Sequence, residues 1–195
     1  MKILYFDLGM GAAGDMLTAA LLEMAEDSEA VLAKLNKAFE GYASIEANSA
    51  EKCGIRGTHV TVTTIAGIED ETMHDHDHHH EHGHSHTSAA KVREFISGLD
   101  LPTTVIKDAL SVYDRIADAE AHVHGVTPEN IHFHEVGSID AMVDVVSVCY
   151  LFNSLKPDSI IASPVHVGSG TVKCAHGILP VPAPAVAEID RKSVV

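Results

Sequence analysis

The stretch Ile3-Leu-Tyr-Phe-Asp-Leu-Gly-Met-Gly-Ala-Ala-Gly-Asp15 indicates how the fold begins. Its mainly apolar residues 3–8 predict a short buried strand. The glycine-rich turn that follows leads into a helix, which we expect to be capped by Asp15 and to end near Ala25. The chain therefore opens with a strand, a turn and a helix.

The three glycines of this turn also fit the pattern G-x-G-x-x-G, which is typical of dinucleotide-binding turns. A dinucleotide fold would next need a second parallel strand that ends in an acidic residue roughly 20 positions later. Residues 30–39 instead have a helical pattern. The pattern therefore does not indicate a dinucleotide fold, although backbone N–H groups at Gly11 and Gly14 are suited to hold a phosphate.

Outward from this stretch, helical and extended periodicities alternate. Asp27 or Ser28 is expected to cap the second helix, and Ser138 the last long one. The expected elements are a helix to about residue 39, strands at 43–51 and 58–65 around a turn at Gly54 and Gly57, helices at 89–98, 104–121 and 138–155, and a strand from 160 followed by a Gly- and Pro-rich region to 184.

These elements predict an α+β (mixed α/β) fold in three parts. Residues 1–66 form a small α/β lobe, residues 67–88 a disordered His-rich linker, and residues 89–195 a mainly helical lobe. The helical lobe carries the sequence His132-Phe-His-Glu135, called HFHE below, and the Gly- and Pro-rich C-terminal segment.

Charge and cysteine content exclude several classes of function. The formal charge is −15, from 13 basic and 28 acidic residues, which argues against nucleic acid or an anionic membrane as partner. The first residues lack the layout of a signal peptide, because Asp7 interrupts the apolar run. No stretch approaches the roughly 20 apolar residues of a membrane span. The three cysteines are scattered, as expected in a reducing compartment, so we expect a cytoplasmic protein.

The central segment is the first candidate metal site. Eight histidines lie within thirteen residues, at 74, 76, 78, 79, 80, 82, 84 and 86. Imidazole nitrogen suits nickel, copper and zinc, and most of these rings are neutral near pH 7. We call this segment the histidine tract and predict that it binds nickel through His74, His76, His78, His79, His80, His82, His84 and His86. The alternative is a solvated linker that collects metal only in vitro.

The HFHE sequence is the second candidate. If residues 131–134 are extended, His132 and His134 point to the same side of the strand. Asp140 and Asp144 then fall on one face of the following helix. Two imidazoles and up to three carboxylates would converge on a transition metal or a metal–nucleotide. The alternative is that Asp140 is only a first-turn carboxylate favoured by the helix dipole, and that the histidines are structural hydrogen-bonding groups.

Two further groups of residues suit phosphate or a divalent cation. Asp7 and Asp15 flank the glycine turn as candidate metal carboxylates. Lys173, in a later glycine-rich segment, is a reasonable phosphate contact because basic residues are few in this chain. A purely structural turn rich in Gly and Pro is an equally good explanation of that later segment.

At these residues the sequence resembles the LarC family of nickel-pincer cofactor biosynthesis proteins. The resemblance rests on Phe6-Asp7 with Gly11, Gly14, Asp15 and Met16, on His124-Gly125, on His132–Gly137 with Asp140 and Asp144, and on Ala162-Ser-Pro164, Gly168-Ser-Gly170, His176-Gly177 and Leu179–Pro184. A histidine-rich insert in the linker is similar to those of many members. The family usually has an aromatic residue and a serine where this chain has Gly9-Met10, so any role of that hydroxyl is lost here.

The resemblance implies an activity. The family inserts nickel into pyridinium-3,5-bisthiocarboxylic acid mononucleotide, as a CTP-dependent nickel chelatase of the lyase class, and so completes the cofactor of lactate racemase. It implies Ni²⁺, CTP with Mg²⁺ or Mn²⁺, the pyridinium mononucleotide as substrate, and apo lactate racemase as acceptor. Members usually continue into a second, nucleotide-binding half, which a separate polypeptide would have to supply to this chain.

The resemblance also implies roles for the candidate residues. The tract would collect nickel, and His132, His134, Glu135 and Asp140 would form the catalytic site, with one of them as base. Lys173 or the turn from Gly11 to Gly14 would hold phosphate. Two rival functions remain: a nickel store or metallochaperone that needs only the tract, and a divalent-metal phosphohydrolase that uses Asp7, Asp15, Asp140 and Asp144.

Overall fold

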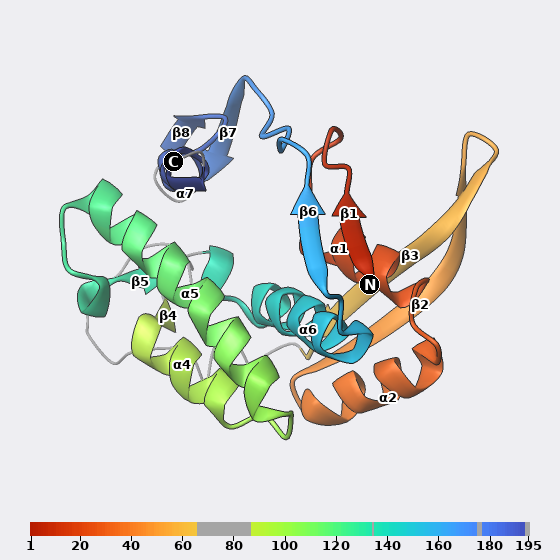
Figure 1. The fold of residues 1–195 in the computed structure, drawn as a ribbon. Coiled ribbons are helices and arrows are strands. Elements are labelled where there is room, and N and C mark those ends of the chain that lie inside the picture. The colour runs from red at the N-terminus through yellow and green to blue at the C-terminus, as the bar shows by residue number, and fades with distance from the viewer. Residues whose placement is uncertain (66–86, 134, 175–176, 194–195) are drawn as a thin grey trace.

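The computed structural model describes residues 1–65, 87–133, 135–174 and 177–193 (Figure 1). The histidine tract and His134 lie outside these residues. The elements are β1 (Ile3–Phe6), α1 (Gly14–Leu22), α2 (Ser28–Ala38), β2 (Ala43–Lys52), β3 (Ile55–Thr64), β4 (Thr87–Ser88), α4 (Ala89–Ser97), α5 (Thr103–His124), the 3-10 helix η1 (Pro128–Asn130), β5 (His132–Phe133), the 3-10 helix η2 (Glu135–Gly137), α6 (Ile139–Leu155), β6 (Ser159–Ala162), β7 (Thr171–Cys174), β8 (Gly177–Pro180) and α7 (Pro184–Ser193). The expected α+β class is confirmed.

The first strand pairs with a strand from far along the chain. β1 and β6 run parallel, with Leu4 opposite Ile160. Just before the strands, the backbone N–H of Lys2 donates to the carboxylate of Asp158, 156 residues away (2.5 Å). The Phe6 ring meets the Phe152 ring of α6 edge-on at 5.8 Å, which anchors β1 on that helix. The sheet thus joins a strand from each predicted lobe, and the lobe boundaries stay a prediction.

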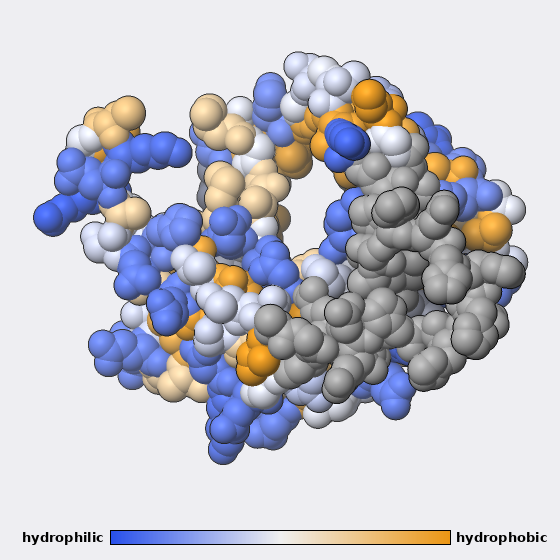
Figure 2. All heavy atoms as spheres, turned by 180° about the vertical axis from the view of Figure 1, so that it is seen from behind, coloured by the Kyte–Doolittle hydropathy of each residue, from blue (hydrophilic) through white to orange (hydrophobic). Residues whose placement is uncertain are grey.

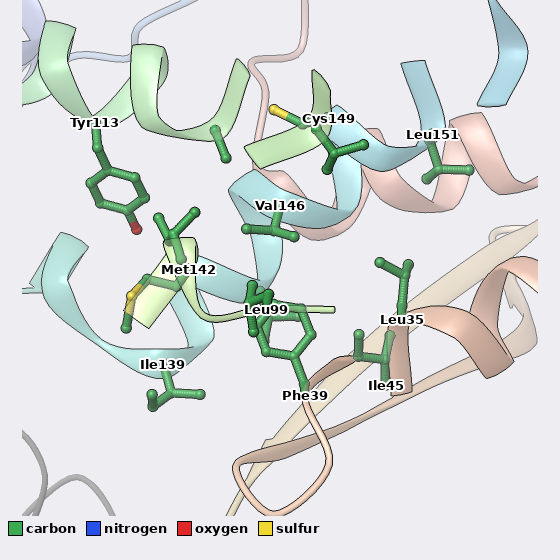
Figure 3. Packing of buried hydrophobic residues seen from close by; sticks show 14 of the residues in the cluster. Leu35, Phe39, Ile45, Leu99, Tyr113, Ile139, Met142, Val146, Cys149 and Leu151 are labelled. Atoms are coloured by element: carbon green, nitrogen blue, oxygen red, sulfur yellow. The ribbon is translucent and has the colours of Figure 1, made fainter. Parts of the chain in front are cut away.

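Helix α6 is the centre of the hydrophobic core. Its buried side chains include Ile139, Met142, Val146 and Leu151, which meet residues of α2, β2, α4 and α5 in one cluster (Figure 3). Burial in this core therefore explains why α6 is mainly apolar. None of the helices in the described ranges is long and apolar enough to cross a membrane.

Two of the predicted helix caps, Asp27 and Ser138, are confirmed by their hydrogen bonds. The Asp27 carboxylate accepts a hydrogen bond from the backbone N–H of Ala30 (2.9 Å), and the Ser138 hydroxyl accepts one from the N–H of Ala141 (3.2 Å). These bonds satisfy backbone donors that the first helical turn leaves free. Asp15 differs from expectation, because it lies inside α1 and Ala13 occupies the capping position.

Three features differ from the pattern-based expectation. The β2–β3 turn is made by Cys53 and Gly54, both with positive φ, while Gly57 lies within β3. β7 and β8 form an antiparallel hairpin within the segment expected to be mostly loop. Helix α7, which the pattern did not predict, packs against α5, and its Arg191 bonds Glu188 one turn earlier (3.0 Å). Tertiary contact here outweighs weak local signals.

Candidate functional site

The loops after β1 and β6 are bonded to each other at the carboxyl ends of these parallel strands. The backbone N–H of Leu8 donates to the Ser163 hydroxyl (2.8 Å), and the N–H of His166 donates to the carbonyl of Leu8 (3.0 Å). Ligands of open parallel sheets bind at this edge, where loops and helix N-termini meet. The glycine turn singled out in the sequence therefore occupies a favourable place for a ligand.

Gly11 brings this turn close to the second loop. Its φ is +88°, and a Cβ at this position would lie 3.3 Å from the carbonyl oxygen of His166. Only glycine readily combines that conformation with such an approach. The Asp7 carboxylate accepts a hydrogen bond from the N–H of Gly9 (3.1 Å), so it stabilises its own turn. The sequence analysis did not single out His166. Its position shortly after the end of a predicted strand was the one signal that it could lie at the site.

Gly14 gives space to an acidic side chain from another helix. A Cβ at Gly14 would lie only 2.4 Å from the side chain of Asp144 on α6. The glycine therefore permits Asp144 to pack against the first turn of α1. Burial, and then the nearby charges of Asp140 and Asp15, raise the pKa of Asp144 to about 6. Three carboxylates thus interact where α1 and α6 begin, as the position of Asp140 and Asp144 on one helix face predicts.

The HFHE sequence begins as a short strand with alternating exposure. His132 is exposed and Phe133 is buried, with the Phe133 ring 5.8 Å from that of Tyr113. Glu135 is exposed at the start of η2. Antiparallel pairing places Thr87 opposite Phe133 and Ser88 opposite His132. Thr87 directly follows the last histidine of the tract in the sequence, so the first described residue after the tract pairs with the HFHE segment.

Tyr113 links the HFHE turn to the carboxylates. Its hydroxyl donates to the backbone carbonyl of Val136 in η2 (3.0 Å). Burial, and then the charge of Asp144, raise the pKa of Tyr113 far above its usual value. Asp144 lies about one and a half turns into α6, the helix that follows this turn directly. The start of α6 therefore connects the glycine turn with the HFHE segment.

Comparison with known proteins shows the family of this chain. The family model for nickel insertion proteins matches residues 4–195. The chain belongs to the nickel insertion protein family. The protein of Akkermansia muciniphila named pyridinium-3,5-bisthiocarboxylic acid mononucleotide nickel insertion protein is 39% identical over 192 residues, covering 98% of this chain and 45% of the relative. Proteins of the same name from Clostridium kluyveri and Geobacillus kaustophilus are 42% and 38% identical, each covering 97% of this chain and 47% and 44% of the relative.

The chain thus spans less than half the length of these curated relatives. No solved structure matches it.

The structure brings together only part of the predicted set of site residues. Asp15, Asp140 and Asp144 interact, and Gly11 and Gly14 lie beside them. Lys173 lies on β7 with its side chain exposed, in a hairpin that Figure 1 shows next to α7 rather than next to the glycine turn. Within the described ranges, no group of three or more His, Cys, Asp or Glu side chains is close enough to hold a metal ion. The predicted ligation by His132, His134 and the tract stays a prediction.

The raised pKa of Asp144 predicts a pH-dependent stability. A carboxyl group whose pKa is higher in the folded state stabilises the fold below its unfolded pKa near 4, and this contribution is lost as the pH rises through about 6. In metal-free protein, Asp144→Asn should therefore stabilise the fold at pH 7 by about 1–3 kcal/mol, a value that allows for solvent screening. This gain should raise the melting temperature by several degrees. The difference should vanish below pH 4.

A matched control for this experiment is Asp118→Asn, which removes the same charge from an exposed position on α5. It should leave the melting temperature nearly unchanged at both pH values. Equal melting curves for wild type and Asp144→Asn at pH 7 would show that the Asp144 carboxylate is not destabilised by its surroundings.

Proposed function

We propose that this chain binds and delivers nickel for its insertion into pyridinium-3,5-bisthiocarboxylic acid mononucleotide, the reaction that forms the nickel-pincer cofactor. The observation that carries the proposal is the β4–β5 ladder, in which Thr87 pairs with Phe133. The chain leaves the histidine tract directly at Thr87, beside the HFHE segment. This ladder supports the proposal that nickel collected by the tract passes to the HFHE segment.

Nickel is the substrate in this scheme, and the tract is its first binding place. Neutral imidazoles bind nickel without first losing a proton. His132 and His134 then hold the ion near the organic substrate. Insertion forms bonds from nickel to two thiocarboxylate sulfurs and to C4 of the pyridinium ring, so the C4 proton must leave. Glu135 or one of the two histidines is the proposed base, and Asp140, at the start of α6, orients this group.

The glycine turn is proposed to hold the phosphate of the mononucleotide. The backbone N–H of Gly14, at the start of α1, is suited to an anion, whereas that of Gly11 donates to the carbonyl of Leu8 (2.9 Å) and shapes the turn. Asp15 and Asp144 would repel the anion. A divalent cation between phosphate and carboxylates, with Asp7 as a further ligand, removes this conflict. Lys173 would contribute only if its hairpin moved toward the turn. The residues present therefore suit a phosphate that arrives with its cation.

Further elements of the proposal come from the family. We propose that CTP with Mg²⁺ or Mn²⁺ drives the insertion, in a reaction of the lyase class. The nucleotide is bound mainly by the part of the family-length protein that this sequence does not cover. The product is passed to apo lactate racemase, and the reaction takes place in the cytoplasm.

Activity should depend on that remaining part. Residues 1–195 alone should show near-background CTP-dependent nickel insertion, because they include less than half of the length of the curated relatives. The measurement is the yield of nickel-containing cofactor, with the full-length Akkermansia muciniphila relative as positive control. Robust multi-turnover activity from residues 1–195 with CTP would show that the nucleotide function has been assigned to the wrong part.

The rival role as a nickel store makes a different prediction. A store binds nickel through the tract but transfers none to the pyridinium mononucleotide, even when the full-length relative's remaining sequence is co-expressed. Transfer under these conditions separates insertion from storage.

A further inference from the structure

Among the residues that the structure describes, strand β1 has one paired edge and one free edge. The carbonyls of Lys2 and Phe6 accept hydrogen bonds from the backbone N–H groups of Asp158 and Ser163 (both 2.8 Å). The backbone N–H and C=O groups of the even-numbered residues therefore point toward β6. By the two-residue period of a strand, the N–H and C=O groups of Ile3 and Tyr5 point the opposite way. Within the described part of the chain, β6 is the sole strand that pairs with β1.

A groove runs along β1 between this strand and helix α1. Its volume is about 290 Å³, and it is lined by residues 3–8, Gly11 and Ala12 together with Met16, Leu17, Ala20 and Leu21 of α1 and Met24 just after it. Met16 and Met24 are 51% and 54% exposed. Apart from Asp7 at one end, the lining side chains are apolar except for the Tyr5 hydroxyl. A free strand edge beside a helix is the geometry in which domains bind an added strand.

The sheet also leaves apolar side chains uncovered on its second face. Leu4 and Phe6 face the core, whereas Ile3 (45% exposed), Tyr5 (64%) and Ile161 (48%) lie on the opposite side. Parallel sheets are normally covered on both faces, and two strands alone are marginally stable. Figure 2 shows that hydrophilic residues predominate on the back of the molecule, with small apolar areas between them. The exposed side chains of Ile3, Tyr5 and Ile161 are thus apolar surface that a partner could cover.

We propose that the free edge of β1 and the β1–α1 groove bind a β-strand from the part of the family-length protein that this sequence does not cover. The occupant follows from length, because curated relatives are more than twice as long as the segment that they share with this chain. A second copy of this chain is disfavoured, because each copy carries a net charge of −15. The inference rests on the proposed function only in assuming that the two parts work together.

Hydrogen exchange tests this docking without nickel or CTP, so its outcome is independent of the insertion chemistry. In residues 1–195 alone, the amides of Ile3 and Tyr5 should exchange rapidly, while those of Leu4 and Phe6 are protected by β6. In the full-length Akkermansia muciniphila relative, the amides aligned with all four positions should be protected. Rapid exchange at the positions aligned with Ile3 and Tyr5 in the full-length protein would overturn the proposal.

The same experiment separates the occupants. Protection of Ile3 and Tyr5 in residues 1–195 alone that increases with protein concentration would assign the edge to a second copy, and would equally overturn the proposal.

A pair of alanine substitutions tests the groove itself. Ala20→Arg places a charged side chain in the groove, whereas Ala33→Arg makes the same change at an exposed position on α2. When residues 1–195 are co-expressed with the remaining sequence of the Akkermansia muciniphila relative, Ala20→Arg should reduce the recovered complex at least tenfold and Ala33→Arg should not. Equal recovery of both variants, with wild-type melting temperatures, would exclude this groove as the docking site.

Discussion

Replacement of the eight tract histidines by asparagine should remove most of the nickel that the purified chain binds. The described residues contain no preformed group of three or more metal-binding side chains, so the tract is expected to supply most of the sites. Asparagine keeps the length and polarity of the segment but lacks the imidazole nitrogen. Metal content after dialysis, measured by mass spectrometry, reports the loss directly.

The pH dependence of nickel binding provides a second test of the tract. Imidazole binds nickel only when it is neutral, so bound nickel should be released as the pH falls through roughly 6.5. The melting temperature of the apo-protein should be the same for wild type and the asparagine variant. An unchanged nickel stoichiometry in the variant would show that nickel binds elsewhere.

His132→Ala and His134→Ala should each abolish cofactor formation while leaving bulk nickel binding nearly intact. The tract histidines substitute for one another, whereas a site with few ligands loses its metal when one is removed. His132 is exposed, so its replacement should change the free energy of unfolding by less than about 0.5 kcal/mol. Loss of activity from His132→Ala therefore cannot be attributed to unfolding. Cofactor yield is measured with the full-length system.

The matched control is His59→Ala, an exposed histidine on β3 outside both candidate segments. Its cofactor yield should equal that of wild type. If His134 is instead a packed, hydrogen-bonded residue, its replacement should lower the melting temperature by several degrees, for about 1–3 kcal/mol. A normal yield from His132→Ala and His134→Ala would end the assignment of HFHE as the chemical centre.

Local features of this fold were predictable from the sequence because they depend on neighbouring residues. The caps at Asp27 and Ser138 follow from side chains that bond a backbone N–H three residues later, and the alternation of His132 and Phe133 follows from strand geometry. Helix α7 was not predictable, because its position depends on packing against α5. The hairpin β7–β8 lies among glycines and prolines whose turn preferences hide the extended segments.

The shared helix face of Asp140 and Asp144 was predictable, but their contact with other elements was not. Asp140 and Asp144 share a helix face by spacing alone. That Asp144 is pressed against α1 depends on the missing side chain of Gly14, a contact between helices more than 120 residues apart in the sequence. The same non-local pairing brings His166 to Gly11, which no local pattern reveals. The pairing of Thr87, directly after the tract, with the HFHE segment likewise became visible only through the two-residue strand β4.

The pairing of β1 with β6 has a consequence for how this protein forms during synthesis. Strand β1 is synthesised before its partner β6, which follows about 150 residues later, a delay of roughly 10–30 s at usual elongation rates. Throughout that interval the apolar segment Ile3–Phe6 has no strand to pair with. Closing so long a loop is slow compared with forming the neighbouring hairpin and helices. The β1–β6 sheet is therefore expected to form after the β2–β3 hairpin and the helices that lie between the two strands in the sequence, and β1 stays exposed to chaperones and aggregation until then.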